Sequence, residues 1–449
     1  MISERVRIGL LGCGNVGAAL VELIDSRRDA IAARTGVRLE VARVAVRSLA
    51  KERAVEVPAD VLTLDAAGVV IDPDIDVVVE VIGGIEPARE LVLAALKAGK
   101  PVVTGNKELL ANVGADLFAA AEEAGVDLLF EAAVAGGIPF IRPLRESLAG
   151  ERIDRIMGIV NGTTNYILTR MTEAGASYAD ALGEAQSLGY AERDPTADVE
   201  GHDAAAKAAI IASIAFGVRV VAGDVYDEGI SRITTADIDY AAKMGYVVKL
   251  LAIAEQHDGA GDPEADGGAA RGGTRGEVAV RVHPAMVPAD HPLASVRDSF
   301  NAVFVEGAAV GDLMFYGRGA GGAPTASAVL GDVIDAALNR TRGSHASIGT
   351  LAKARIRPID EVESAYYLNL DVFDRPGVLA AVAGVFGRHD VSIRSMEQEG
   401  LGGEARLVFI THVAREAAVQ ATIRDLHHLD AVDRITSVLR VVASSDGTP

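Results

Sequence analysis

Hydrophobic positions in the first third of the chain alternate between short continuous apolar runs and longer segments with a helical repeat. Strands that are apolar on both faces are typical of a parallel sheet covered by helices on its two sides. The pattern therefore predicts a doubly wound α/β domain over residues 1–150. The predicted strands are residues 6–11, 38–46, 75–84, 101–106 and 126–134, and the clearest helices are residues 87–99 and 107–125.

A glycine motif joins the first predicted strand to a helix. Gly12, Gly14 and Gly17 stand in the order GxGxxG, with Asn15 and Val16 between the last two. In such a turn the first glycine permits the tight bend, the second lets a pyrophosphate approach the backbone, and the third lets helix and strand pack closely. These five residues predict the cofactor site of a Rossmann domain. A turn with a purely structural role is the alternative.

Two further strand ends carry candidate cofactor residues. The second strand ends at Arg47, without the acidic side chain that usually takes a ribose 2′-hydroxyl. Arginine there suits a 2′-phosphate, so NADP(H) is favoured and NAD(H) remains open. Thr104 and Lys107 follow a later strand. Ligands bind at this edge of an open α/β sheet, so Lys107 is expected to face the nicotinamide or the substrate.

An acidic segment precedes a lysine in the middle of the chain. Glu192, Asp198 and Asp203 stand ahead of Lys207. Asp203 and Lys207 are four residues apart in a stretch with high helix propensity, so both project from one helix face. A surface ion pair is the simpler interpretation. Carboxylates gathered round one lysine would also suit the ammonium group of an amino acid beside a general acid/base. Upstream, the polar turn at residues 161–165 opens a helix, and capping is its favoured role over carboxylate binding.

Composition narrows the partners and the compartment. The formal net charge of −20 argues against a nucleic-acid partner, because a phosphate backbone needs clustered Lys and Arg. Cys13 is the one cysteine in the sequence, so no disulfide can form within the chain and a reducing compartment is favoured. No window approaches the roughly 18 uninterrupted apolar residues of a membrane span. We therefore expect a cytoplasmic protein with no membrane partner.

The middle segment gives the chain a resemblance to the homoserine dehydrogenases. The acidic spacing before Lys207 is preceded by GTTNYIL at 162–168 and followed by YGRGAGGAPTASAVLGD at 316–332, so the resemblance extends over nearly the whole chain. It implies an NAD(P)-dependent oxidoreductase that interconverts L-aspartate 4-semialdehyde and L-homoserine, in the biosynthesis of threonine, methionine and isoleucine. Lys207 would then be the proton donor and acceptor, with Lys107 beside it at the nicotinamide.

The resemblance also implies further ligands. Residues 130–139 are similar to the family's segment that holds a monovalent cation, usually sodium, and a glycine-rich strand end without an ion is the alternative. The implied cation ligands are Glu131, Val134, Gly136 and Ile138. Residues matching those that hold the substrate or the catalytic lysine are Glu192, Asp198 and Asp203, with Gly162 and Thr163 also on the substrate side, while Gly189 and Gly321 match cofactor-contacting glycines.

The last hundred residues have the order strand, helix, strand, strand, helix, strand, which predicts a ferredoxin-like βαββαβ unit separate from the rest. FDRPGVL at 373–379 resembles the ACT domain, which commonly binds amino acids between paired copies. Threonine inhibition is thus a hypothesis from resemblance, with Asp374 and Gly377 as contacts. A dimerisation module that binds nothing is the alternative.

These predictions divide the chain into parts. The dinucleotide domain covers residues 1–150 and is completed by about 320–343, and an α+β catalytic and dimerisation domain covers 151–319. A linker at 344–362 precedes the ACT domain at 363–442, and residues 257–276 form a surface loop. A homo-oligomer, dimer or tetramer, is expected. Two other functions stay open: a different amino-acid dehydrogenase on the same fold, and a nonenzymatic cofactor sensor. The paired lysines argue against the sensor.

Overall fold

The computed structural model describes residues 4–257, 277–349, 351–353, 355–400, 402 and 404–442. The loop predicted at 257–276 lies outside these residues, except for His257, which ends a strand. The chain divides into two compact units. Unit 1 comprises Met1–Arg155, Ala206–Val225 and Asn301–Ala354, and unit 2 comprises Ile156–Ala205, Tyr226–Phe300 and Arg355–Pro449. In the described part of the chain, no helix is both long and apolar enough to cross a membrane.

Unit 1 contains a six-stranded parallel sheet with the order β3-β2-β1-β4-β5-β6. The central strands are buried, which follows from their continuous apolar sequences. The strand order reverses at β1, the point where a doubly wound sheet binds its ligand. The predicted Rossmann architecture is confirmed. The strands are β1 (Glu4–Leu11), β2 (Val37–Ala45), β3 (Leu62–Thr63), β4 (Val77–Glu80), β5 (Val102–Thr104) and β6 (Leu128–Leu129).

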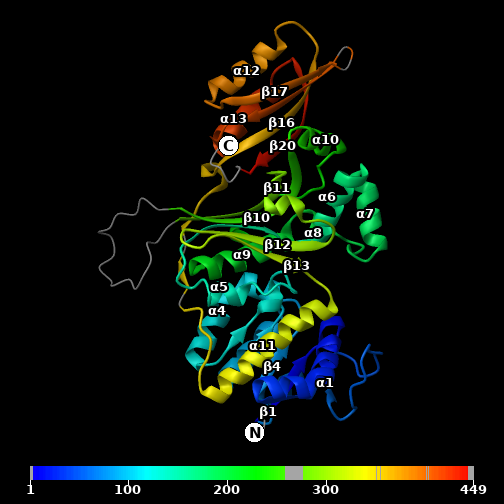
Figure 1. The fold of residues 1–449 in the computed structure, drawn as a ribbon, viewed down its shortest axis with the longest axis vertical. Helices are drawn as coiled ribbons and strands as arrows, with labels where there is room; N and C mark the ends of the chain where they lie inside the picture. Colours follow the sequence, from blue (N-terminus) through cyan, green and yellow to red (C-terminus); the bar gives the residue numbers. More distant parts are fainter. Residues whose placement is uncertain are drawn as a thin grey trace, which may run out of the picture. The chain divides into compact units, whose positions relative to one another are not determined.

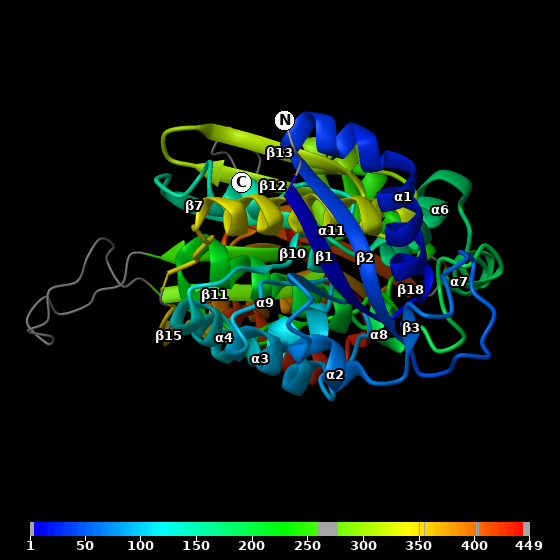
Figure 2. The same cartoon turned by 90° about the horizontal axis from the view of Figure 1, so that it is seen from below.

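Helices cover this sheet, and one of them comes from late in the chain. Helix α11 (Gly322–Arg342) shares a buried core with α1 (Asn15–Thr35) and β1, through residues such as Leu20 and Val329. Figure 2 shows β1 and β2 side by side, with α1 alongside them and α11 crossing them. The other helices of unit 1 are α2 (Ala66–Ile71), α3 (Ala88–Lys97), α4 (Lys107–Ala124), α5 (Ile141–Arg145) and most of α9 (His202–Phe216). Its remaining strands include β12 (Phe300–Gly307) and β13 (Gly311–Arg318).

Unit 2 is built on a mixed sheet whose strands run β7-β10-β11-β20-β16-β18-β17. The long strands β10 (Tyr246–His257) and β11 (Glu277–Pro288) pair antiparallel along their whole length, and β7 (Ile153–Ile159) begins in unit 1. The helices of this part are α6 (Gly162–Ala174), α7 (Tyr178–Ser187), α8 (Thr196–Val199) and α10 (Thr235–Lys243). Short elements complete it: β9 (Tyr226–Asp227), β15 (Arg355–Ile356), η3 (Pro292–Ser295) and η4 (Ile359–Glu361).

The C-terminal residues form the predicted βαββαβ arrangement (Figure 1). Its helices pack on one face of its sheet round Val382, Phe386 and Phe409. This module was expected to be separate, but its last strand pairs with β11 of the same unit, at Ala285–Arg440. The elements are β16 (Glu363–Phe373), α12 (Val378–Arg388), β17 (Ile393–Gly400), β18 (Glu404–Thr411), α13 (Glu416–His427) and β20 (Val432–Val441), with a short β19 (Ala414–Arg415).

Candidate active site

The glycine turn after β1 has the geometry that its sequence predicts. Gly12 has a positive φ of 99°, and its N–H donates to the carbonyl of Ala45 at 2.9 Å. A Cβ on Gly17 would lie 2.3 Å from the carbonyl oxygen of Gly12, so only glycine lets α1 pack this closely. A Cβ on Gly14 would meet no described atom within 4 Å. Gly14 is therefore not required for protein packing, which fits a residue kept small for a ligand.

A second helix begins beside this turn. Gly321 precedes α11 with φ 122° and ψ 153°, a conformation open essentially to glycine alone. A Cβ on the next residue, Gly322, would lie 3.2 Å from the carbonyl oxygen of Asn15. Neither Gly14 nor Gly321 offers a side chain to cap its helix. The starts of α1 and α11 thus meet, and their N–H groups and dipoles favour an anion such as a pyrophosphate.

Arg47 lies exposed just beyond β2, as expected for a residue that reaches a ribose phosphate. Sequence reasoning missed a second arginine there. Arg53 donates to the carbonyls of Ser48, Leu49 and Lys51 and so holds the loop after β2 in place. Burial raises the pKa of the Cys13 thiol, and the charge of Arg53 lowers it by less. Arg53 thus lies near the glycine turn. The one feature of the sequence that could have indicated Arg53 is its position as a cation in the loop after β2.

A buried polar network holds the strand ends before Lys107. Glu80 is fully buried, accepts from the hydroxyl of Thr104 at 2.5 Å, and accepts from the N–H groups of Ile82 and Gly83. Asn106 caps α4 by accepting from the N–H of Leu109 at 3.0 Å, and its amide group donates to Gly84 at 2.7 Å. Lys107 follows directly as the first residue of α4. Thr104 is therefore hydrogen-bonded to Glu80. The sequence did not single out Glu80, because it stands within the apolar run of β4.

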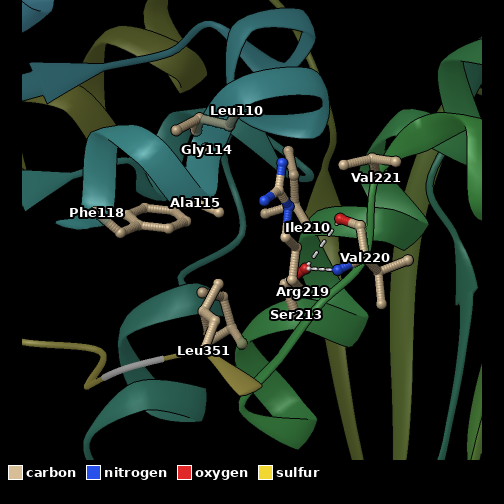
Figure 3. A pocket seen from close by; sticks show the side chains of 11 residues that line it. Leu110, Gly114, Ala115, Phe118, Ile210, Ser213, Arg219, Val220, Val221 and Leu351 are labelled. Carbon is tan, nitrogen blue, oxygen red and sulfur yellow. Dashed lines mark hydrogen bonds between the residues drawn. The ribbon is translucent and has the colours of Figure 1, made fainter. Parts of the chain in front are cut away.

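The two predicted lysines stand near the N-terminal ends of two helices that line a common pocket. Lys107 opens α4, and Lys207, only 9% exposed, lies in the second turn of α9. Three or more residues beyond them, both helices line the same apolar pocket, α4 with Leu110 and Gly114 and α9 with Ile210 and Ser213 (Figure 3). Within unit 1, Lys107 and Lys207 thus each stand three residues before a residue that lines this pocket, Leu110 and Ile210.

Two of the predicted acidic residues, Asp198 and Asp203, bind the side-chain amide of Asn161 in unit 2. The Nδ2 atom of Asn161 donates to Asp198 at 2.7 Å and to Asp203 at 2.9 Å. Its Oδ1 atom accepts from the N–H of Thr164 at 2.9 Å and so caps α6. Capping was the favoured role for this turn and is confirmed. The same side chain also joins two carboxylates from separate elements, and only the tertiary structure reveals this second role.

The remaining residues of this group differ in how they are placed. Thr163 donates to the carbonyl of Tyr190 at 2.6 Å and lies 3.4 Å from Asp198, so it ties the loop after α7 to the carboxylates. A Cβ on Gly162 would lie 2.7 Å from the carbonyl oxygen of Ser299. Gly189 turns the loop with φ 77°. Glu192 has an exposed side chain, and its carbonyl accepts from Gln186 at 3.0 Å, so this residue enters the described contacts through its backbone.

The segment expected to hold a cation is a tight buried turn. Glu131 accepts from the N–H groups of Phe140, Ile141 and Arg142, at 2.5, 2.7 and 2.8 Å. A carboxylate offers about four lone-pair sites, so one remains on the oxygen that Arg142 contacts. Ala135 has a φ of 50°, which bends the chain between Val134 and Gly136. One carboxylate with backbone carbonyls is a donor set that suits a hard cation.

Two neighbours enclose this turn. A Cβ on Gly136 would lie 2.9 Å from the hydroxyl of Thr325, so the backbone passes too close for a side chain. Ile138, the last implied ligand, is fully buried and donates its N–H to Ala135 at 2.7 Å. Burial raises the pKa of Asp332, which accepts from the N–H of Glu131, to about 8. Among the described residues no cluster of three or more His, Cys, Asp or Glu side chains forms a metal site.

The turn predicted to bind an effector in the C-terminal module is exposed. Gly377 precedes α12 with φ 90°, where a side chain would be strained. Asp374 lies on the same exposed turn, and Arg375 stacks over the ring of Phe373 at 5.2 Å. Both predicted effector residues are therefore accessible to a small molecule.

Comparison with known proteins identifies the family. The model described as homoserine dehydrogenase matches residues 139–334, and the model for the homoserine dehydrogenase NAD binding domain matches 12–131. The homoserine dehydrogenase of Corynebacterium glutamicum is 52% identical over 439 residues, which is 98% of this chain and 96% of the relative. The chain belongs to the homoserine dehydrogenase family. The ACT model matches residues 366–430, so the predicted C-terminal ACT domain is also confirmed.

Other homoserine dehydrogenases agree. The Mycobacterium tuberculosis relative is 50% identical over 445 residues, 98% of each chain. The crystal structure of the Thiobacillus denitrificans homoserine dehydrogenase has a TM-score of 0.90 at 42% identity and covers 98% of each chain. A hyperthermophilic archaeal homoserine dehydrogenase in complex with NADPH has a TM-score of 0.58 at 29% identity, covering 75% of this chain and 98% of that one. The family makes this chain an oxidoreductase of homoserine and aspartate semialdehyde with a nicotinamide cofactor, as predicted.

Proposed function

We propose that Lys207 is the general acid/base of this homoserine dehydrogenase and that Asp198 and Asp203 hold the ammonium group of its substrate. The observation that carries this assignment is the single amide of Asn161 joined to both carboxylates, with Asp203 one helical turn from Lys207 on α9. A substrate ammonium group at Asp203 brings the carbonyl at the far end of the same small molecule within reach of Lys207.

Each side chain then has one task in the reduction of the semialdehyde. Lys207 donates a proton to the oxygen of the carbonyl as negative charge develops there. Lys107 stabilises that charge electrostatically. Thr163 and Gly162 shape the substrate end of α6, and Glu192 serves the substrate from the exposed loop. The nicotinamide supplies the hydride when bound.

The cofactor site that we propose is the junction of two helix starts. Gly12, Gly14, Asn15, Val16 and Gly17 would take the pyrophosphate together with Gly321. Thr104 would face the nicotinamide, and Gly189 is proposed as a further cofactor glycine from its match to the family. Arg47 would contact a 2′-phosphate, so NADP(H) is preferred over NAD(H). The carboxylate of Glu131 and the carbonyls of Val134, Gly136 and Ile138 would hold Na⁺, whose role is to fix this turn.

The wider assignments follow the same division of the chain. Residues 1–150 with 320–343 bind the dinucleotide, residues 151–319 bind the substrate and the partner subunit of a dimer or tetramer, and the linker at 344–362 leads to the regulatory domain at 363–442. Threonine is the proposed effector, at Asp374 and Gly377. One cysteine and a substrate from amino-acid biosynthesis favour the cytoplasm.

The test follows the absorbance of NADPH with aspartate semialdehyde, for the wild type and Lys207→Ala. We expect turnover by the wild type and a loss of kcat of about 10²–10⁴-fold in the variant, the usual contribution of a general acid. The dissociation constant of NADPH should stay unchanged. The control is Lys97→Ala, an exposed lysine in the last turn of α3.

Near-normal turnover by Lys207→Ala would refute the role of that lysine. A wild type that uses NADH as well as NADPH would refute the cofactor preference. Turnover with other amino-acid semialdehydes, but not with aspartate semialdehyde, would refute the proposed substrate.

A further inference from the structure

The regulatory domain is joined to the substrate-binding unit through one buried arginine. Strand β20 lies between β16 of its own domain and β11 (Figure 1). Arg440 is the residue of β20 that pairs with Ala285 of β11, and it is only 5% exposed. A buried charge is stable only with close partners of opposite sign. The partners of Arg440 therefore show which parts of unit 2 this domain holds.

Arg440 binds one carboxylate on each side. Its Nε atom donates to Glu416, at the start of α13, at 2.9 Å, and its Nη1 atom donates to Glu228 at 3.0 Å. The guanidinium group lies 5.2 Å from the ring centre of Tyr226, whose hydroxyl also donates to Glu228. Although burial lowers it, the two carboxylates raise the pKa of Arg440 above its ordinary value. The arginine is thus a permanent charged link between the ACT domain and Glu228.

Glu228 belongs to a segment that packs directly on residues 199–202, the loop between Asp198 and Asp203. The N–H of Ile230 donates to the carbonyl of Val199 at 2.8 Å. A Cβ on Gly229 would lie 2.2 Å from that same carbonyl oxygen, and a Cβ on Gly201 would lie 3.1 Å from the carbonyl oxygen of Glu228. The two backbones are so close together that no side chain lies between them to absorb a displacement. A displacement of the backbone at Glu228 is therefore passed directly to residues 199–201.

A second contact ties the same two segments together. His202, the first residue of α9, lies with its Nδ1 atom 2.6 Å from the carboxylate of Asp227. The loop from 199 to 202 runs between Asp198 and Asp203, the two carboxylates that Asn161 joins. The path from β20 to these carboxylates thus consists of direct contacts within unit 2.

We propose, building on the function proposed above, that Arg440 is a positioning residue for the substrate: through Glu228 it sets the separation of Asp198 and Asp203. Arg440 touches neither the substrate nor the cofactor. Its effect is on the affinity for the amino-acid substrate, and the same contact is the route by which a ligand of the ACT domain changes that affinity.

The test compares Glu228→Gln and Arg440→Lys with the wild type in steady-state kinetics. Glu228→Gln removes the charge at one end of the link and leaves Glu416 in place. Arg440→Lys keeps the charge but cannot reach two carboxylates as a fork. We expect the KM for aspartate semialdehyde to rise by about threefold to tenfold in both, with kcat and the KM for NADPH changed by less than about twofold.

The matched control is Arg434→Lys. Arg434 lies on the same strand and pairs with Asp371 inside the ACT domain, at 2.6 Å. This variant should leave the KM for the semialdehyde unchanged. Equal KM values in all three variants and the wild type would overturn the positioning role, and so would losses of kcat and of thermal midpoint that leave KM unchanged. A wild type without turnover would overturn the proposed function, and the positioning role with it.

Discussion

Single side chains in this protein cap a local turn or helix and join distant segments at once. Asn161 caps α6 with its oxygen and joins Asp198 to Asp203 with its nitrogen, so its two ends have separable roles. Glu80 is comparable, because it gathers Thr104 and two loop N–H groups before Lys107. A residue chosen only for capping would not need the second set of contacts.

The substitution Asn161→Asp separates the two roles of Asn161. Aspartate retains the oxygen that caps α6 but places a third carboxylate against Asp198 and Asp203. We expect the KM for aspartate semialdehyde to rise by about tenfold or more, because hydrogen bonds to charged groups contribute about 1.5–3 kcal/mol. Steady-state kinetics and a thermal melt measure the two effects.

Ser177→Ala is the control for this change. Ser177 caps α7 by accepting from the N–H of Asp180, so its loss should cost about 1 kcal/mol of stability and leave KM unchanged. An Asn161→Asp enzyme with the wild-type KM would show that the amide does not organise the substrate carboxylates.

At the scale of elements, the start of a helix decides where an anion can bind. α1 and α11 come from opposite parts of the chain, yet Asn15 and Gly322 are in close contact at their starts. α9 differs, since its first two turns carry Asp203 and Lys207 and its later turns line a pocket together with α4. Glycine at each crowded position is required by geometry, whereas the open position of Gly14 at the start of α1 leaves room for a ligand.

Gly14→Ala and Gly17→Ala test this distinction. The Cβ of Gly17→Ala would collide with Gly12, so we expect the free energy of unfolding to fall by about 1–3 kcal/mol or more. Gly14 has an extended backbone with no described atom near a Cβ, so Gly14→Ala should keep its stability. Its dissociation constant for NADPH should rise, because the new methyl group occupies the place of the pyrophosphate.

Chemical denaturation and a fluorescence titration with NADPH give both quantities. Gly331→Ala, at an open position within α11, is the control and should bind NADPH normally. Wild-type affinity in Gly14→Ala would place the cofactor elsewhere.

For the whole molecule, the main feature is the joining of the ACT domain to residues 156–205 and 226–300 in one compact unit. The ACT domain shares its sheet with β11, and Asp237 of α10 accepts from Tyr367 on the other face of that domain's sheet. The sheet of the ACT domain is therefore continuous with the strands that precede it in unit 2.

Asp374→Ala tests the proposed effector turn. We expect threonine to suppress NADPH consumption by the wild type, and Asp374→Ala to lose this suppression while its kcat without threonine stays normal. The reason is that an exposed carboxylate is a direct partner for the ammonium group of an amino acid. Asp433→Ala, an exposed carboxylate on β20, is the control and should remain sensitive.

A wild type indifferent to threonine would leave the domain with another ligand. Suppression of the Asp374→Ala enzyme by threonine would show that threonine does not bind through Asp374 at this turn.

Much of this protein could be read from local patterns. The parallel strands, the GxGxxG turn, the helix carrying Asp203 and Lys207, and the βαββαβ order all rest on residues within a few positions of one another. Hydrophobic periodicity and the steric needs of a tight turn act over this short range, so the amino-acid order is sufficient to specify them.

The tertiary structure decided which of these pieces meet. It brought Gly322 to Asn15, placed Asn161 between Asp198 and Asp203, and joined Arg440 to Glu228. It also left Glu192 exposed, although Glu192 belongs to the same family-like spacing before Lys207 as Asp198 and Asp203. Such contacts link residues far apart in the chain, and their approach depends on how whole elements pack. No local repeat carries that information, because packing is a property of the assembled core.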